Sequence, residues 1–142
     1  MREFFKEITN EIDINENIVR EISPITLAYI GDAVYELYIR SILVKGNPKK
    51  NVNEINKETI SYVKAQAQSE TLHSIMESLT DEEKEVVRRG RNAKSGTVPK
   101  NANLTEYKHA TAFECLIGYM YITREYDRLF EIIKKSVDGR EI

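Results

Sequence analysis

Two carboxylates lie in stretches that are otherwise apolar, where a charged side chain has to face water, a partner or a metal ion. Asp32 lies in "LAYIGDAVYE", and it forms one polar line with Glu36 and Arg40 because these residues recur at every fourth position of an apolar helical stretch. Glu114 is the only acidic or basic residue in "ATAFECLIGYMYIT". Both stretches therefore combine a largely apolar helix with a carboxylate that could do chemistry.

Two glycines predict that these helices cross closely. Gly31 precedes Asp32, and Gly118 follows Glu114 by one turn. Glycine inside a helix costs about 1 kcal/mol relative to alanine, and close packing would offset that cost. Two converging carboxylates repel unless a cation lies between them, and their oxygens suit Mg²⁺, with Mn²⁺ as a substitute. The alternative is a solvated stripe in which Glu36 pairs with Arg40 and Glu114 pairs with a lysine.

A third segment concentrates positive charge. The chain has a formal net charge of −2, yet "RRGRNAKSGTVPKNAN" contains no acidic residue. Arginine, lysine and short hydrogen-bonding side chains contact phosphates, and the segment has no aromatic residue on which single-stranded bases could stack. Recognition of a duplex RNA backbone therefore fits better, with a solvated flexible loop as the alternative. The expected RNA-binding residues are Arg88, Arg89, Arg91, Asn92, Lys94, Ser95 and Lys100.

Helices have to position these residues, because strand signals are scarce and helical periods recur. Apolar spacing predicts helices over residues 23–46, 51–79, 80–90, 104–123 and 124–137, the second of them as one long amphipathic helix. Ser23 and Thr80 are the expected N-caps, and Pro24 suits a first helical position. With 142 residues, of which 41% are hydrophobic, the chain is expected to form one all-α domain over residues 1–142.

Composition also bears on location. The single cysteine, Cys115, cannot form an internal disulfide and is expected in the core. The charged start of the chain and the lack of a membrane-length apolar span predict a cytoplasmic protein without a membrane partner.

The motifs "LAYIGDAVYELYIR", "RRGRNAKSGTVPKNA" and "YKHATAFECLIGYMY" together resemble the ribonuclease III family, and in it the compact Mini-ribonuclease III branch. The resemblance covers residues 23–122. It implies the all-helical ribonuclease III endonuclease-domain fold without a separate RNA-binding domain, a homodimer, and Mg²⁺-dependent cleavage of double-stranded RNA. It further implies maturation of the ends of the 23S ribosomal RNA precursor, with a ribosomal protein as a candidate partner.

By position, the resemblance assigns Asp32 and Glu114 as catalytic residues and metal ligands. Glutamates that the larger relatives carry before Asp32 are replaced by Ile25 and Ala28, and the aspartate one turn before Glu114 is replaced by Thr111. The expected reaction is metal-assisted hydrolysis that leaves 5′-phosphate and 3′-hydroxyl ends. Because metal is available, no acid–base role is expected for the two histidines of the chain, His73 and His109.

Two other functions and the residues of a subunit interface are also considered for this chain. A non-catalytic helical RNA-binding factor for ribosome assembly would use the same basic segment. A nucleotide phosphohydrolase ranks below it, because such enzymes need clustered histidine and aspartate ligands and the chain has only two histidines. Candidate residues for the subunit interface are Tyr35, Tyr38 and Tyr119, with core packing as their alternative role.

Overall fold

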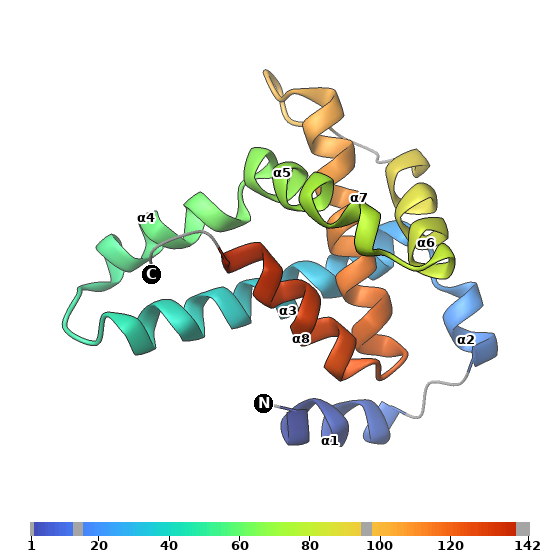
Figure 1. The fold of residues 1–142 in the computed structure, drawn as a ribbon, viewed down its shortest axis with the longest axis horizontal. Helices are drawn as coiled ribbons and strands as arrows, with labels where there is room; N and C mark the ends of the chain where they lie inside the picture. The colour runs from blue at the N-terminus through green and yellow to red at the C-terminus, as the bar shows by residue number, and fades with distance from the viewer. Residues whose placement is uncertain (1, 13–15, 95–97, 139–142) are drawn as a thin grey trace.

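The structure, a computed structural model, describes residues 2–12, 16–94 and 98–138 as helices with short connections (Figure 1). In chain order the elements are α1 (Arg2–Ile12), α2 (Glu16–Glu21), α3 (Pro24–Gly46), α4 (Val52–Val63), α5 (Ala65–Ile75), η1 (Met76–Ser78), α6 (Asp81–Asn92), α7 (Leu104–Ile122) and α8 (Tyr126–Val137). These three ranges contain no strand, which confirms the predicted all-α class. Over the same ranges, no helix combines the length and apolarity that crossing a membrane requires.

Capping residues start the helices that carry the site. The Ser23 hydroxyl accepts a hydrogen bond from the third residue of α3, and Pro24 is the first residue of that helix, as predicted. Thr80 and Glu83 form a reciprocal capping box at the start of α6. Asn103 caps α7, which begins at Leu104. These local contacts fix where each helix begins.

The single long helix predicted for residues 51–79 is wrong. The backbone leaves helical geometry at Lys64 (φ −64°, ψ 154°), which separates α4 from α5. No glycine or proline marks this break in "YVKAQA". Helix α4 packs on α3 whereas α5 packs on α7, and the bend lets the chain cover both. Tertiary packing therefore overrides the local helical preference at this point.

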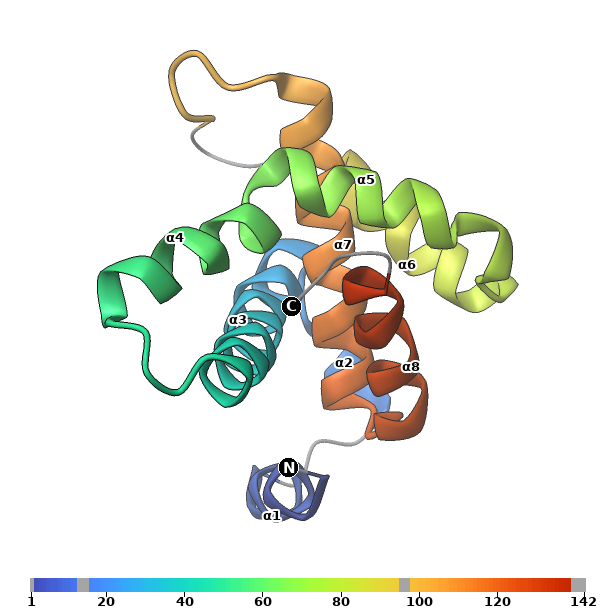
Figure 2. The same cartoon turned by 60° about the vertical axis from the view of Figure 1, so that its left-hand side comes forward.

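Helices α3 and α7 form the centre of the molecule, as their nearly uniform apolarity predicts. Helix α7 contacts α3, α5, α6 and α8. In two views α7 runs through the middle of the fold and α3 crosses it, while α3 and α4 continue as a hairpin on one side (Figures 1 and 2). The core side chains of α7 include Phe113, Leu116, Ile117 and Met120, and Cys115 is also buried, as expected.

The tyrosines proposed for a subunit interface do not share one surface. Tyr35 is in the core with 1% of its area exposed, its ring packs edge to face on Phe113, and its hydroxyl bonds Ser136, so its assignment to the interface is wrong. Tyr38 and Tyr119 are half-buried. The exposed apolar side chains of α3 are instead Tyr29, Leu37 and Val44.

Candidate active site

The crossing of α3 and α7 brings the two predicted carboxylates together. A Cβ atom added to Gly31 would lie 1.8 Å from the backbone oxygen of Glu114, and one added to Gly118 would lie 1.9 Å from the backbone oxygen of Leu27. The helices therefore touch backbone to backbone, and only glycine fits at both positions. Asp32 follows Gly31 directly, and its carboxylate lies close enough to the Glu114 carboxyl to raise the pKa of that group. The predicted close crossing and the convergence of the two side chains are confirmed.

The electrostatics of this pair are unfavourable for two charges. Burial, then the neighbouring Asp32 carboxylate and, least, the charge of Glu36 together raise the pKa of Glu114 to about 9. At neutral pH without a cation, the protonated form of Glu114 is therefore favoured. Asp32 itself is exposed, so solvent reaches the pair from the side of α3.

Gln68 is a site residue that the sequence reasoning missed. It comes from α5, where 2% of its area is exposed, and its side chain approaches Glu114 and lowers the pKa of that carboxyl. Its Nε2 nevertheless has no hydrogen bond of ordinary length to any residue that the structure describes. An unsatisfied buried donor costs about 1–3 kcal/mol. A signal was available, because Gln68 shares the helical spacing of Leu72 and Ile75, which places a polar residue on an apolar face.

The donor set fits a hard divalent cation with few protein ligands. Asp32 and Glu114 offer carboxylate oxygens next to solvent, and a cation between them would offset the repulsion that keeps Glu114 protonated. Mg²⁺ in phosphoryl-transfer sites is often held by one or two carboxylates, with water and substrate phosphates completing its shell. Within the described ranges there is no group of three or more histidine, cysteine, aspartate and glutamate residues that could hold a metal. Asp32 and Glu114 are thus the residues that would hold the ion.

Glu36 occupies the next turn of α3 but has a partner of its own. Its carboxylate accepts a hydrogen bond of 3.0 Å from Arg40, and the pair lies at the surface. This is the helix-surface ion pair that the spacing allowed for these two residues. Its charge still raises the pKa of Glu114, so Glu36 influences the site although its hydrogen bond is to Arg40.

The predicted RNA-binding segment is partly helical. Arg88, Arg89, Arg91 and Asn92 are exposed residues of α6, which extends two residues further than predicted, to Asn92. Lys94 and Lys100 are exposed in the connection from α6 to α7, and Ser95 lies outside the described residues. Arg88 binds Glu85 through two hydrogen bonds of 2.9 Å and 2.6 Å, so part of its charge is neutralised within the helix. The segment leads directly into α7, and Glu114 lies roughly 15 Å along that helix from its start.

The two histidines meet on a different side of α7. Their rings pack edge to face with centroids 5.2 Å apart, and Ser69 Oγ lies 3.3 Å from Nδ1 of His109. Burial, with the nearby His73 and Arg91, lowers the pKa of His109. The two rings form an edge-to-face contact between α5 and α7.

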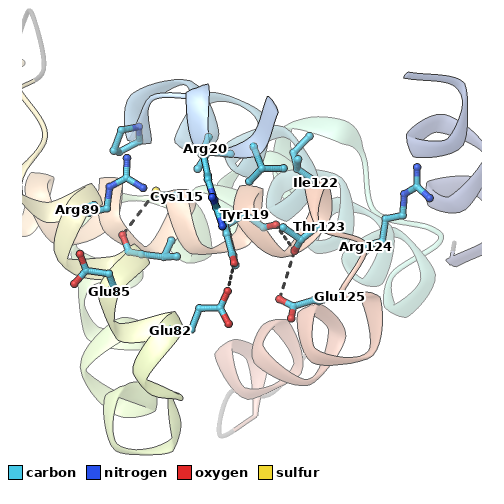
Figure 3. Close-up of a pocket in the computed structure, with 14 residues that line it drawn as sticks. Arg20, Glu82, Glu85, Arg89, Cys115, Tyr119, Ile122, Thr123, Arg124 and Glu125 are labelled. Carbon is cyan, nitrogen blue, oxygen red and sulfur yellow. Dashed lines mark hydrogen bonds between the residues drawn. The ribbon is translucent and has the colours of Figure 1, made fainter. Parts of the chain in front are cut away.

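A cavity of about 840 Å³ lies away from the carboxylates, between α2, α3, α6 and the second half of α7 (Figure 3). Its acidic side chains are engaged, since Tyr119 bonds Glu82 and Thr123 bonds Glu125. Burial raises the pKa of Cys115, which also lines the cavity, to about 12, so its thiol is not a nucleophile at neutral pH. Neither Asp32 nor Glu114 lines it, and we do not assign it to the reaction.

Known proteins resemble this chain in sequence and in fold. Residues 25–125 match the ribonuclease III domain. A Mini-ribonuclease 3 of Thermoanaerobacter sp. (strain X514) is 50% identical over 119 residues, which cover 84% of this chain and 83% of that protein. A Mini-ribonuclease 3 of Clostridium tetani is 47% identical over 120 residues, covering 84% of this chain and 80% of that protein. A crystal structure of a Fusobacterium nucleatum protein superposes with a TM-score of 0.78 at 33% identity, and covers 87% of this chain and 98% of that one. The chain therefore belongs to the ribonuclease III domain family and, within it, to the Mini-ribonuclease 3 proteins.

Proposed function

We propose that the protein is a Mg²⁺-dependent endoribonuclease that cleaves double-stranded RNA, and that Asp32 and Glu114 are its catalytic residues and metal ligands. The observation that carries the proposal is the convergence of these two side chains across the crossing at Gly31 and Gly118. A protein that only bound RNA would gain nothing from an electrostatically unfavourable carboxylate pair at the α3–α7 crossing. The basic segment alone would serve such a protein.

The chain's own residues have two tasks in this reaction. Asp32 and Glu114 would hold the cation at the surface of the α3–α7 crossing, and Glu114 would have to be deprotonated to serve as a ligand. Bound Mg²⁺ acidifies water and stabilises charge on a phosphoryl group, and Mn²⁺ is a candidate substitute. Hydrolysis at the 3′ oxygen would leave 5′-phosphate and 3′-hydroxyl ends. The rigid backbone contact at Gly31 keeps both carboxylates aligned, which orients the reacting groups.

Substrate binding would use the end of α6 and the connection to α7. Arg89, Arg91, Lys94 and Lys100 are exposed there, and arginine and lysine bind phosphates of an RNA duplex without reading its sequence. The same connection leads into α7, so a duplex bound at this segment lies beside the helix that carries Glu114. The substrate we propose is the duplex that joins the ends of the 23S ribosomal RNA precursor, with a ribosomal protein as a candidate partner.

A homodimer would have two carboxylate sites, one for each strand of the RNA duplex. Helix α3 has exposed apolar side chains at Tyr29 (81% exposed), Leu37 (43%) and Val44 (51%). Their spacing puts them on one face of the helix, next to the line that contains Asp32. An exposed apolar stripe of this kind is typical of protein–protein contacts. We propose this stripe, in place of Tyr35, as the subunit interface.

The test compares cleavage of a long RNA duplex by the parent protein and by Asp32→Asn, with and without Mg²⁺. Asparagine keeps the size and a carbonyl oxygen but removes the charge, so we expect cleavage to be lost while duplex binding through the basic segment remains. Glu77→Gln is the control, because it removes one exposed carboxylate that does not affect Glu114. It should cleave at about the parental rate. Cleavage by Asp32→Asn at the parental rate, or cleavage by the parent without any divalent cation, would refute the proposal.

A further inference from the structure

Gln68 combines three features that a packing residue does not need. It is almost completely buried, its Nε2 has no recorded hydrogen bond to any described residue, and it approaches the Glu114 carboxyl from a third helix. A leucine or methionine would fill the same space without leaving a donor unsatisfied. Buried polar groups without partners in a native structure call for a functional explanation.

The break in the chain at Lys64 is what brings Gln68 to this position. The backbone N–H of Gln68 bonds the carbonyl of Lys64 at 3.1 Å, so Gln68 lies one turn into α5. The bend at Lys64 turns α5 away from α3 and onto α7. Gln68 thus approaches Glu114 from α5, whereas Asp32 comes from α3. Three helices each contribute one side chain to this junction.

We infer that Gln68 is a positioning residue for the cation site, whose amide N–H group orients the Glu114 carboxylate so that it and Asp32 bind one divalent cation. The inference rests on the proposed function. A carboxylate has two oxygens and a rotatable bond, and a donor on one oxygen fixes the direction of the other. A cation attracts the Glu114 carboxylate but does not fix its rotamer. A hydrogen bond from an amide group held in place by its own helix does fix it. Such outer partners of metal ligands typically contribute 10–100-fold to metal affinity.

A purely structural role makes a different prediction. If Gln68 only filled space, an unbranched apolar residue of equal length would leave cation binding unchanged. If Gln68 positions Glu114, the same substitution would weaken cation binding although the fold and the RNA contacts remain. Cation affinity and cation-free stability therefore separate the two roles.

The experiment measures Mn²⁺ affinity by electron paramagnetic resonance for the parent, Gln68→Met and Gln66→Met. Gln66 is the matched control, since it is exposed on the same helix and its side chain bonds Glu70. We expect Gln68→Met to bind Mn²⁺ about 10–100-fold more weakly, to melt without cation at or above the parental temperature, and to bind duplex RNA as the parent does. Gln66→Met should match the parent in all three measurements.

Several results would overturn the inference. Mn²⁺ affinity of Gln68→Met within about twofold of the parent would show that the amide does not position the ligand. Unfolding of both Gln68→Met and Gln68→Leu without cation would show that the amide is needed for the fold itself. A parent protein that binds Mn²⁺ and cleaves duplex RNA keeps the proposed function in either case, whereas a parent that binds no divalent cation would refute the proposed function and this inference with it.

Discussion

Replacing Glu114 with glutamine should stabilise the cation-free protein at neutral pH, although it removes a proposed catalytic group. The folded protein holds the pKa of Glu114 at about 9, against an ordinary value of 4.5. Because the pKa of Glu114 is higher in the folded than in the unfolded state, this carboxyl makes its full contribution to folding stability at pH values below its ordinary pKa of 4.5. The contribution is then lost as the pH rises through about 9, because the unfolded chain ionises first. Glutamine cannot ionise in either state, so the variant escapes this loss.

The size of the effect at pH 7 follows from the distance between that pH and the unfolded pKa. With Glu114 protonated in the folded state, the unfolded state gains about 1.4 kcal/mol for each pH unit above 4.5. The penalty at pH 7 is therefore up to about 3 kcal/mol. For a chain of 142 residues, each kcal/mol shifts the melting temperature by roughly 2–4 °C, so Glu114→Gln should melt about 6–12 °C above the parent.

Thermal unfolding followed by circular dichroism in the presence of a chelator measures this difference. The melting temperatures of parent and variant should coincide near pH 4.5 and separate as the pH rises to 7, and saturating Mg²⁺ should stabilise the parent alone. Glu77→Gln, which changes an exposed carboxylate, controls for the loss of one charge. A Glu114→Gln variant that melts at or below the parental temperature at pH 7 would refute the electrostatic reasoning for this pair.

Three further predictions concern packing, a histidine and the basic segment. Gly118→Ala should lower the free energy of unfolding by about 3 kcal/mol or more in urea titrations, because its Cβ would lie 1.9 Å from a backbone oxygen of α3; a parental value would contradict the close crossing. The pKa of His109 is lowered in the fold, so the parent should lose stability as the pH falls below 6.5, and His109→Phe should flatten that part of the melting profile; equal slopes would show that another group titrates. Arg91→Ala should weaken duplex RNA binding and reduce its log–log salt slope by about 0.9, taking A-form RNA as similar to DNA. Arg88→Ala should have a smaller effect, because Arg88 is bound to Glu85, and equal losses in the two variants would show that this ion pair does not matter.

The sequence by itself determined the helical class, most helix starts and the two helices at the centre of the fold. These properties depend on residues that are neighbours in the chain. A capping box needs Thr80 and Glu83 three positions apart, and a buried helix needs an apolar run such as "TAFECLIGYMY". The convergence of Asp32 and Glu114 was also predictable, because a glycine inside a helix is costly and signals a close approach.

Only the tertiary structure decided the break at Lys64, the burial of Tyr35 and the presence of Gln68 beside Glu114. The segment around Lys64 has no glycine or proline, and it bends where α4 packs on α3 and α5 packs on α7. Tyr35 and Tyr29 are both tyrosines of α3, yet one is 1% exposed and the other 81%, because only one of them faces α7. Gln68 reaches the carboxylates through that bend. Such outcomes depend on contacts between residues distant in the chain, and a pattern of neighbouring residues does not specify which distant surface a helix face will meet.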